Sequence, residues 1–82
     1  MPDVSIRLFA RFRELAGAET ISVRLPPGAT VADLRDRLGR LWPDAVGLLQ
    51  ASAVAVNEEY AGPDYVIESG DDLALIPPVS GG

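Results

Sequence analysis

One segment of the chain, residues 31–41, has both the length and the spacing of an amphipathic helix, and it constrains what the rest must supply. Thr30 is a good N-cap, and Asp33 at the third helical position forms a short variant of the capping box. Pro43 is expected to end the helix. The apolar stripe is Val31, Leu34, Leu38 and Leu41, and the arginines expected on the exposed side are Arg35, Arg37 and Arg40. This stripe has to be buried against another layer of structure.

Shorter segments alternate apolar and polar residues with the period of a strand: residues 4–10, 20–26, 52–57 and 73–77. The side chains expected to face the core are Val4, Ile6, Leu8, Ile21, Val23, Leu25, Val54, Val56, Leu73 and Leu75. The connection between the first two segments is modest, so we expect these two strands to pair antiparallel. Together the strands supply a sheet on which the helix packs.

The order of these elements is two strands, a helix, at least two further strands, and a tail. A mixed sheet with one face packed on a main helix is an α+β solution, and this order predicts a ubiquitin-like β-grasp. Residues 1–76 are expected to form that domain and residues 77–82 a flexible, extended C-terminal tail. Residues 11–19 and 44–50 predict only short helical turns, the first of them closed by Gly17.

Composition narrows the possible functions. Eighty-two residues make one domain, and the chain contains no Cys and no His. Disulfides, thiolate nucleophiles, imidazole bases and the common zinc ligand sets are therefore absent, and we expect no metal site and no bound cofactor. A net charge of −5 argues against a nucleic-acid partner. No apolar run approaches the roughly 20 residues that span a bilayer, so we expect a cytoplasmic protein without membrane contact.

All seven basic residues of the chain are arginines, and none is lysine. One interpretation is genomic, because a GC-rich genome encodes Arg where others encode Lys. The other is chemical. Lys amines and Cys thiols attack activated acyl groups, whereas the guanidinium group does not, so a chain with an activated carboxylate would avoid acylating itself.

Two acidic pairs have competing interpretations. Asp71 and Asp72 follow Gly70 and have the composition of a metal site or, more simply, of a turn. Glu58 and Glu59 are expected at the solvated tip of a hairpin. The aromatic residues expected to pack at helix ends are Phe12 and Trp42. The chain by itself predicts no catalytic machinery.

On each predicted strand, the residues between the core residues point to the opposite face of the sheet. The apolar ones among them define a second apolar surface. If the core residues named above point inward, the outward apolar residues are Phe9, Ala53, Ala55, Ala74 and Ile76. Scattered apolar side chains on a surface carry little meaning, but a contiguous patch indicates a partner. We therefore expect a partner surface on the outer side of the sheet.

The C-terminal segment has a composition of its own. Pro77 and Pro78 have no amide N–H to donate, so they stop the sheet and favour an extended exit. Residues 77–82 reach roughly 20 Å when extended. Gly81 and Gly82 lack side chains, so they fit a narrow channel and leave the terminal carboxylate accessible. A frayed end is the usual alternative for a terminus, but here the glycines follow a rigid spacer.

These motifs together resemble a known family. The segments "LFARFRELAG", "AVAVNEE" and "SGDDLALIPPVSGG" are similar to those of the small, sulfur-carrying subunits of molybdopterin synthase, within the wider family that includes the thiamin sulfur carrier. The resemblance covers nearly the whole chain. Its most specific element is the C-terminal Pro-Pro-Val-x-Gly-Gly sequence.

The resemblance implies a role for each matching residue. Gly82 would carry an acyl-adenylate and then a thiocarboxylate, and Gly81 would give access to it. The remaining residues of the inserted tail would be Pro77, Pro78, Val79 and Ser80. Phe9, Tyr60 and Ile76 match positions of an apolar contact surface, and Arg13 matches an arginine that would bond carboxylates of a partner.

The resemblance also implies partners: an ATP-dependent, ubiquitin-activating-type adenylyltransferase, a sulfur donor, and the large subunit of molybdopterin synthase, where sulfur passes to a pterin precursor. Related carriers for thiamin or tRNA thiolation also end in Gly-Gly, and so do ubiquitin-like modifiers that are joined to lysines. A binding module with an incidental tail is a further alternative. The acceptor therefore stays open at this point.

Overall fold

The computed structural model describes residues 3–78, so the expectations for Val79, Ser80, Gly81 and Gly82 lie outside the described residues. Its centre is a five-stranded mixed sheet in the order β2-β1-β5-β3-β4. The strands are β1 (Asp3–Leu8), β2 (Thr20–Arg24), β3 (Ala53–Val56), β4 (Glu59–Tyr60) and β5 (Leu73–Ile76). As expected, β1 and β2 pair antiparallel, whereas β1 and β5 are parallel neighbours although they lie at opposite ends of the chain.

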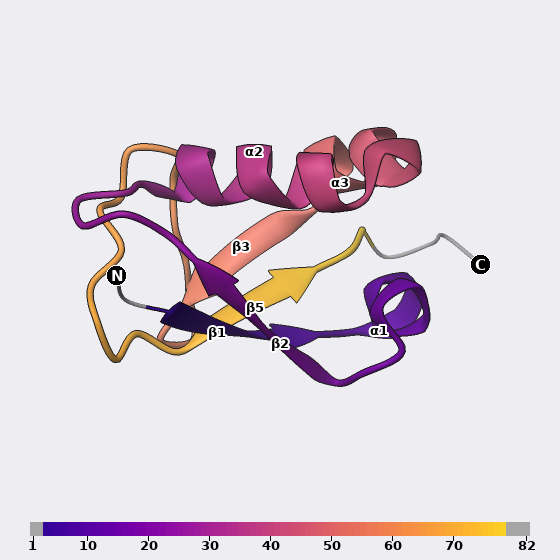
Figure 1. Cartoon of the computed structure of the whole chain (residues 1–82), viewed down its shortest axis with the longest axis horizontal. Helices are drawn as coiled ribbons and strands as arrows, with labels where there is room; N and C mark the ends of the chain where they lie inside the picture. The colour runs from indigo at the N-terminus through magenta and orange to yellow at the C-terminus, as the bar shows by residue number, and fades with distance from the viewer. Residues whose placement is uncertain (1–2, 79–82) are drawn as a thin grey trace.

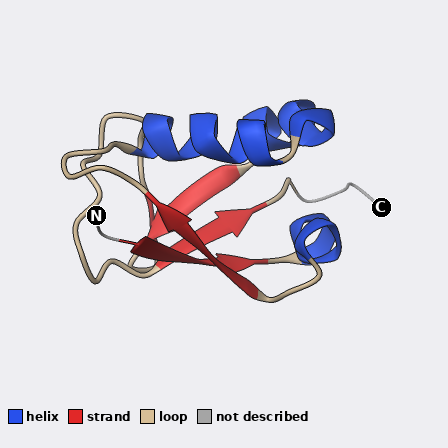
Figure 2. Cartoon of the chain, viewed as in Figure 1, coloured by secondary structure: helices blue, strands red, loops and turns tan. Residues whose placement is uncertain are grey.

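The helices are α1 (Ala10–Ala16), α2 (Val31–Leu41), the 3-10 helix η1 (Pro43–Ala45) and α3 (Val46–Ala51). Figure 1 shows α2 and α3 side by side above the sheet, while α1 lies at the end of the sheet near the C-terminus of β1. Figure 2 shows the same two layers, helix over strand, coloured by secondary structure. Within residues 3–78, no helix combines the length and the hydropathy needed to cross a bilayer.

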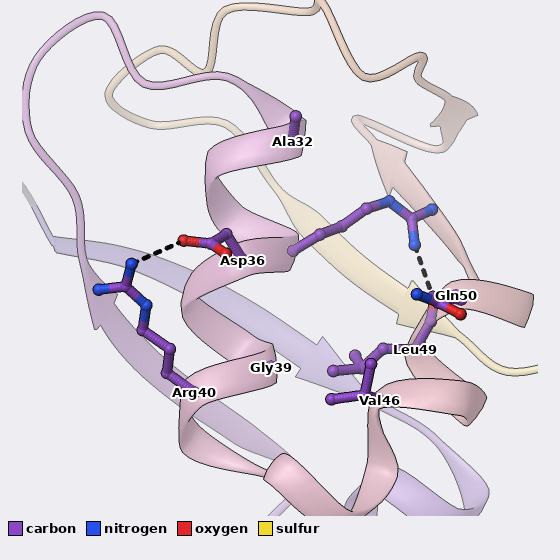
Figure 3. Close-up of a pocket in the computed structure, with 8 residues that line it drawn as sticks. Ala32, Asp36, Gly39, Arg40, Val46, Leu49 and Gln50 are labelled. Atoms are coloured by element: carbon purple, nitrogen blue, oxygen red, sulfur yellow. Dashed lines mark hydrogen bonds and ion pairs between the residues drawn. The ribbon is translucent and has the colours of Figure 1, made fainter.

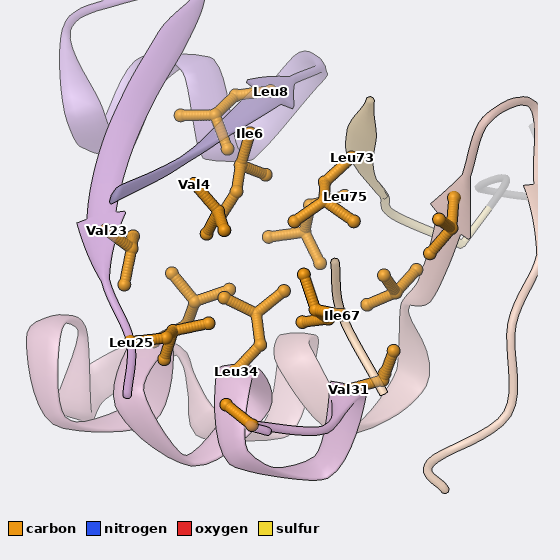
Figure 4. Packing of buried hydrophobic residues seen from close by; sticks show 14 of the residues in the cluster. Val4, Ile6, Leu8, Val23, Leu25, Val31, Leu34, Ile67, Leu73 and Leu75 are labelled. Atoms are coloured by element: carbon orange, nitrogen blue, oxygen red, sulfur yellow. The ribbon is translucent and has the colours of Figure 1, made fainter. Parts of the chain in front are cut away.

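The core fills the space between these two layers (Figure 4). Strand β1 alternates strictly between exposed and buried side chains, and Val4, Ile6 and Leu8 are the buried ones. The other predicted inward residues are buried as well, except that Ile21 is only partly buried. The capping box also forms, since the Thr30 amide donates to Asp33 Oδ2 at 2.9 Å and the Asp33 amide to Thr30 Oγ1 at 3.3 Å.

The prediction for Leu41 is wrong, because its side chain is 55% exposed. Leu38, the last buried residue of α2, is fully buried, and the helical spacing offers either the third or the fourth residue after it as the next member of the stripe. Trp42 takes that place. Its ring packs on the buried ring of Phe12, with the centroids 5.8 Å apart, which confirms the predicted packing of both aromatic residues.

The prediction for Arg35 is also wrong, because this side chain is half-buried rather than displayed to solvent. Its guanidinium group donates to the carbonyl oxygen of Leu49 at 2.8 Å and to that of Ser52 at 2.7 Å. The carbonyl groups at the end of a short helix lack further intrahelical donors; that of Leu49 also accepts from the Ser52 amide at 3.1 Å, and the guanidinium group adds a second donor there and one at Ser52. Arg35 therefore ties α2 to the end of α3.

Segment 10–16 forms a full helix rather than the single turn expected. Gly17 ends it, as predicted, with φ 69° in the left-handed region, and its amide donates to the carbonyl of Arg13 at 2.9 Å. The second helical segment is confirmed as η1 and α3, and Pro43 begins η1 directly after α2 has ended.

The turn of the hairpin between β3 and β4 lies one residue earlier in the chain than the predicted tip, Glu58 and Glu59. Val56 pairs with Glu59, so the turn consists of Asn57 and Glu58, and Glu59 is a strand residue instead of part of the tip. Both turn residues have positive φ, 52° for Asn57 and 71° for Glu58. A two-residue turn of this kind prefers glycine at its second position, where Glu58 has a side chain that disfavours this backbone conformation.

Replacing Glu58 by glycine is therefore expected to stabilise the protein. The Glu58→Gly variant should raise the free energy of unfolding by about 0.5–1 kcal/mol, since glycine removes the strain of positive φ but adds some unfolded-state entropy. Urea denaturation measures the change. The matched control is Glu59→Gly, which places glycine in a paired strand and should lower stability. An equal effect of the two variants would contradict the assignment of the turn.

Candidate functional site

The pairing of the strands defines one outer face of the sheet, directed away from the helices. Residues paired across neighbouring strands point to the same side, and the register joins Ala53 to Ile76, Ala55 to Ala74, and Ala55 to Tyr60. None of these residues belongs to the buried cluster beneath the helices. The predicted outward parity is confirmed, and Tyr60, known before only from the resemblance, lies on the same face.

The five apolar residues expected on this face differ in their exposure. Phe9 is 39% exposed, and Tyr60 beside them is 76% exposed. Ala55 and Ala74, in contrast, are only 6% and 7% exposed, so the expectation that they face solvent is wrong. They occupy the middle strands, where short side chains lie lower than their larger neighbours. The exposed part of the outer face therefore consists mainly of its larger side chains, and the two alanines add little surface to it.

Arg7 borders this face and was not singled out by sequence. It pairs with Ala74 in the parallel register of β1 and β5, so it lies in the same row as the two alanines. Its guanidinium group contacts Asp72 Oδ2 at 2.7 Å, and both side chains are about half exposed. The alternation in the sequence did place Arg7 outward, but only the strand register shows that it lies next to Ala74. It contributes a polar margin with a charge balanced by Asp72.

The chain leaves the sheet beside this face. β5 ends at Ile76, Pro77 is half-buried and Pro78 is exposed. Leu8 of β1 pairs in parallel with Leu75 of β5, so the next residues, Phe9 and Ile76, come at the same end of neighbouring strands. Neither proline has an amide hydrogen to extend the ladder. The sheet therefore brings an apolar surface to the point from which residues 77–82 depart.

Arg13 lies next to this region by way of α1. Phe9 is the N-cap of α1, and Arg13 is exposed in the last turn of the same short helix. Among the ion pairs of residues 3–78, none involves Arg13. Its guanidinium group is consequently available to a carboxylate of another molecule.

Asp71, which lies shortly before β5, stabilises its own loop through hydrogen bonds. Asp71 accepts hydrogen bonds from the Glu68 amide at 2.8 Å, from Tyr65 Oη at 2.9 Å and from Asn57 Nδ2 at 3.0 Å. The bond from the Glu68 amide is the main reason that the pKa of Asp71 is lowered. The same carboxylate raises the pKa of Tyr65, first through their hydrogen bond. The turn interpretation is confirmed for Asp71, which also fastens this loop to the β3–β4 hairpin.

Within residues 3–78, no group of three or more His, Cys, Asp or Glu side chains is arranged to hold a metal ion. The described residues do present an apolar outer face, an exposed arginine and, beside them, the strand end that Pro77 and Pro78 follow.

Comparison with known proteins gives this surface a context. Residues 6–82 match the ThiS family. The chain is 40% identical over 80 residues to the molybdopterin synthase sulfur carrier subunit of Dictyostelium discoideum, covering 94% of this chain and 93% of that one. The crystal structure of SAMP1 from Haloferax volcanii has a TM-score of 0.80 at 34% identity and covers 98% of this chain and 99% of that one.

A third similar structure is the complex of subunits 1 and 2 of the molybdopterin-converting factor from Helicobacter pylori. It shares the fold at 22% identity, with a TM-score of 0.67 and a coverage of 98% of this chain and 99% of that one. The predicted ubiquitin-like β-grasp is confirmed. So is the resemblance to the sulfur-carrying subunits of molybdopterin synthase. On the match over residues 6–82 and on identity that runs nearly end to end, this chain belongs to the ThiS family.

Proposed function

We propose that this chain is the sulfur carrier of a molybdopterin synthase. Its Gly82 would be adenylated, converted to a thiocarboxylate, and inserted into the large subunit, where the sulfur passes to a pterin precursor. The observation that carries the proposal is the near full-length similarity to a molybdopterin synthase sulfur carrier subunit, combined with a family match that includes Gly81 and Gly82. The outer face supports it, because an apolar surface lies beside the strand end from which the tail departs.

The chemistry requires activation, since a free carboxylate has a poor leaving group. ATP supplies it: the carboxylate attacks the α-phosphate, pyrophosphate leaves, and a mixed anhydride with AMP remains. Hydrosulfide supplied by the sulfur donor then displaces AMP as the leaving group, and after loss of its proton the sulfur stays on Gly82 as a thiocarboxylate. The chain has no Cys and no Lys to intercept the anhydride. ATP would be held by the activating enzyme, and this chain would bind no cofactor.

Each part of the proposed site has a separate task. Phe9, Tyr60 and Ile76 would contact the large subunit, and Arg13 would bond a carboxylate on it. Pro77 and Pro78 would hold the exit extended, which lowers the entropy lost when the tail is inserted. A structure that pairs subunits 1 and 2 of a molybdopterin-converting factor supports a partner of this kind.

A second function has its own support. A curated sequence from Haloferax volcanii has the name small archaeal modifier protein 1. In a sequence alignment it is 38% identical to this chain over 84 residues. A modifier uses the same activation but transfers its terminal glycine to lysines of other proteins. Carriers for thiamin or for tRNA thiolation share the activation as well. The acceptor of the activated group distinguishes these functions.

The test is a reconstitution with ATP, the activating enzyme and a sulfur donor. Mass spectrometry should show the replacement of one oxygen by one sulfur, localised to Gly82. The matched control has one residue added after Gly82, which turns the acyl group into an internal peptide bond, and it should gain nothing.

The loaded chain is then given to the large subunit and the pterin precursor. Formation of molybdopterin with return of the plain carboxylate supports the proposal. Recovery of the chain linked to lysines of other proteins, without a pterin product, would establish the modifier function instead. Failure of adenylation would overturn both.

A further inference from the structure

The helix layer contains a hollow that the proposed function does not use. It lies between α2 and α3 and has a volume of about 480 Å³. Val46 and Leu49 of α3 form its apolar side, and Gly39 faces them from α2 (Figure 3). Leu49 is buried, whereas Val46 is 39% exposed although it is apolar. The hollow therefore exposes the apolar side chain of Val46, with the buried Leu49 beside it.

Gly39 keeps the hollow open without a packing reason in the fold. Glycine in the interior of a helix costs about 0.5–1 kcal/mol relative to alanine. A Cβ atom on Gly39 would meet only Val46 Cγ2, at 3.8 Å, which is an ordinary van der Waals contact. The fold would thus accept a side chain here and gain stability from it. A destabilising residue that preserves an empty apolar space indicates that the space has an occupant.

The charge around the hollow identifies the class of occupant. Arg35 and Arg40 line it together with a single carboxylate, that of Asp36. Asp36 pairs with Arg40 at 3.3 Å. Arg35 donates only to neutral carbonyl groups, so its charge has no carboxylate partner among the described residues. The hollow thus carries a net positive charge on a chain with a net charge of −5.

We propose that this hollow is a second docking site, and that it takes an acidic segment of a partner protein that presents an apolar side chain. The apolar side chain would lie on Val46 over Gly39, one carboxylate would approach Arg35 on the α3 side, and a second would approach Arg40, which Figure 3 shows on the other side of α2. The helix layer and the outer face lie on opposite sides of the sheet, so both surfaces are available at the same time. This site is independent of the proposed sulfur transfer.

A pair of short peptides tests the proposal on the full ¹⁵N-labelled chain. The probe is acetyl-Leu-Glu-Leu-Asp-amide, and the charge-reversed control is acetyl-Leu-Lys-Leu-Lys-amide. Non-specific attraction to a chain of charge −5 favours the basic peptide. The proposal expects the opposite: the acidic peptide shifts the amide signals of Gly39, Val46 and Leu49, and the basic peptide does not.

Two variants locate the binding. Gly39→Leu fills the hollow and should weaken the acidic peptide about tenfold or more, because the apolar contact is lost, while helix propensity keeps the fold intact. Arg40→Gln should weaken it about threefold, as expected for an exposed ion pair. Arg37→Gln is the matched control, since Arg37 is on α2 but does not line the hollow, and it should change nothing.

The proposal is overturned if neither peptide shifts these signals, or if both shift them equally. It is also overturned if the same signals shift when the chain alone is diluted, because the occupant would then be a second copy. An unchanged affinity of the Gly39→Leu variant, with its fold verified by circular dichroism, would place the peptide elsewhere and likewise overturn it.

Discussion

A chain that lacks Gly81 and Gly82 is expected to lose sulfur loading completely and to keep its thermal stability. Within residues 3–78, the buried cluster ends at Leu75 and the last strand at Ile76, so neither described residue of the tail, Pro77 or Pro78, belongs to that cluster. Loading fails because no glycine carboxylate remains for adenylation. Thermal unfolding and mass spectrometry after incubation with ATP, the activating enzyme and a sulfur donor measure the two effects.

The control for this deletion lies in the same segment. Ser80→Ala changes the tail but keeps both glycines, and it should load normally. A fall in Tm of about 4 °C corresponds to about 0.5–1 kcal/mol in a domain of this size, and a larger fall on deletion would give the glycines a structural role. That outcome would contradict the division into a domain of residues 1–76 and a tail of residues 77–82.

The second large effect concerns the outer face. Ile76→Asp is expected to weaken binding to the large subunit by about 2 kcal/mol, or roughly 30-fold, because it places a charge in the centre of an apolar contact. Ile76 is paired with Ala53 on the outer face and lies outside the core cluster, so the fold of the isolated chain should survive. Isothermal titration calorimetry and circular dichroism measure the two quantities.

Val66→Asp is the matched control for that substitution. Val66 is also apolar and 50% exposed, but it lies beside Thr30 at the start of α2, away from the outer face. This variant should bind with unchanged affinity. Equal losses for the two variants would show that added negative charge, rather than the outer face, decides binding. Collapse of the Ile76→Asp fold would mean that this side chain supports the core.

Features that depend on neighbours in sequence could be predicted without coordinates. The period of two along β1 placed Val4, Ile6 and Leu8 inward, and the spacing around Thr30 and Asp33 identified the capping box. The same local reasoning located the exit at Pro77. It found the outward parity of Phe9 and Ile76, since parity needs only the strand and not its partners, whereas Tyr60 and Arg13 were named only from the resemblance.

Local reasoning failed where a side chain is satisfied by a distant segment. Arg35 was expected in solvent because charged side chains on a helix usually lie there. Instead, its guanidinium group lies within hydrogen-bonding distance of the carbonyl groups of Leu49 and Ser52. Leu41 and Trp42 compete for one position of the stripe, and the ring of Phe12, from another helix, decides in favour of Trp42. The one sign of the hollow in the sequence is Gly39 itself, a glycine in the interior of the predicted helix.

The two-layer class, the faces of the four predicted strands and the bounds of α2 could be read from the chain alone, because they follow from backbone periodicity and local hydrogen bonding. The position of β5 between β1 and β3, in contrast, could be known only from the three-dimensional structure. This position brings Phe9 beside Ile76, and it leaves Ala55 and Ala74 nearly buried. The tertiary structure also decided that α3 lies along α2 and encloses a hollow. Pairing and packing join residues far apart in the chain, so their outcome depends on the shape and charge of both partners, which no local pattern contains.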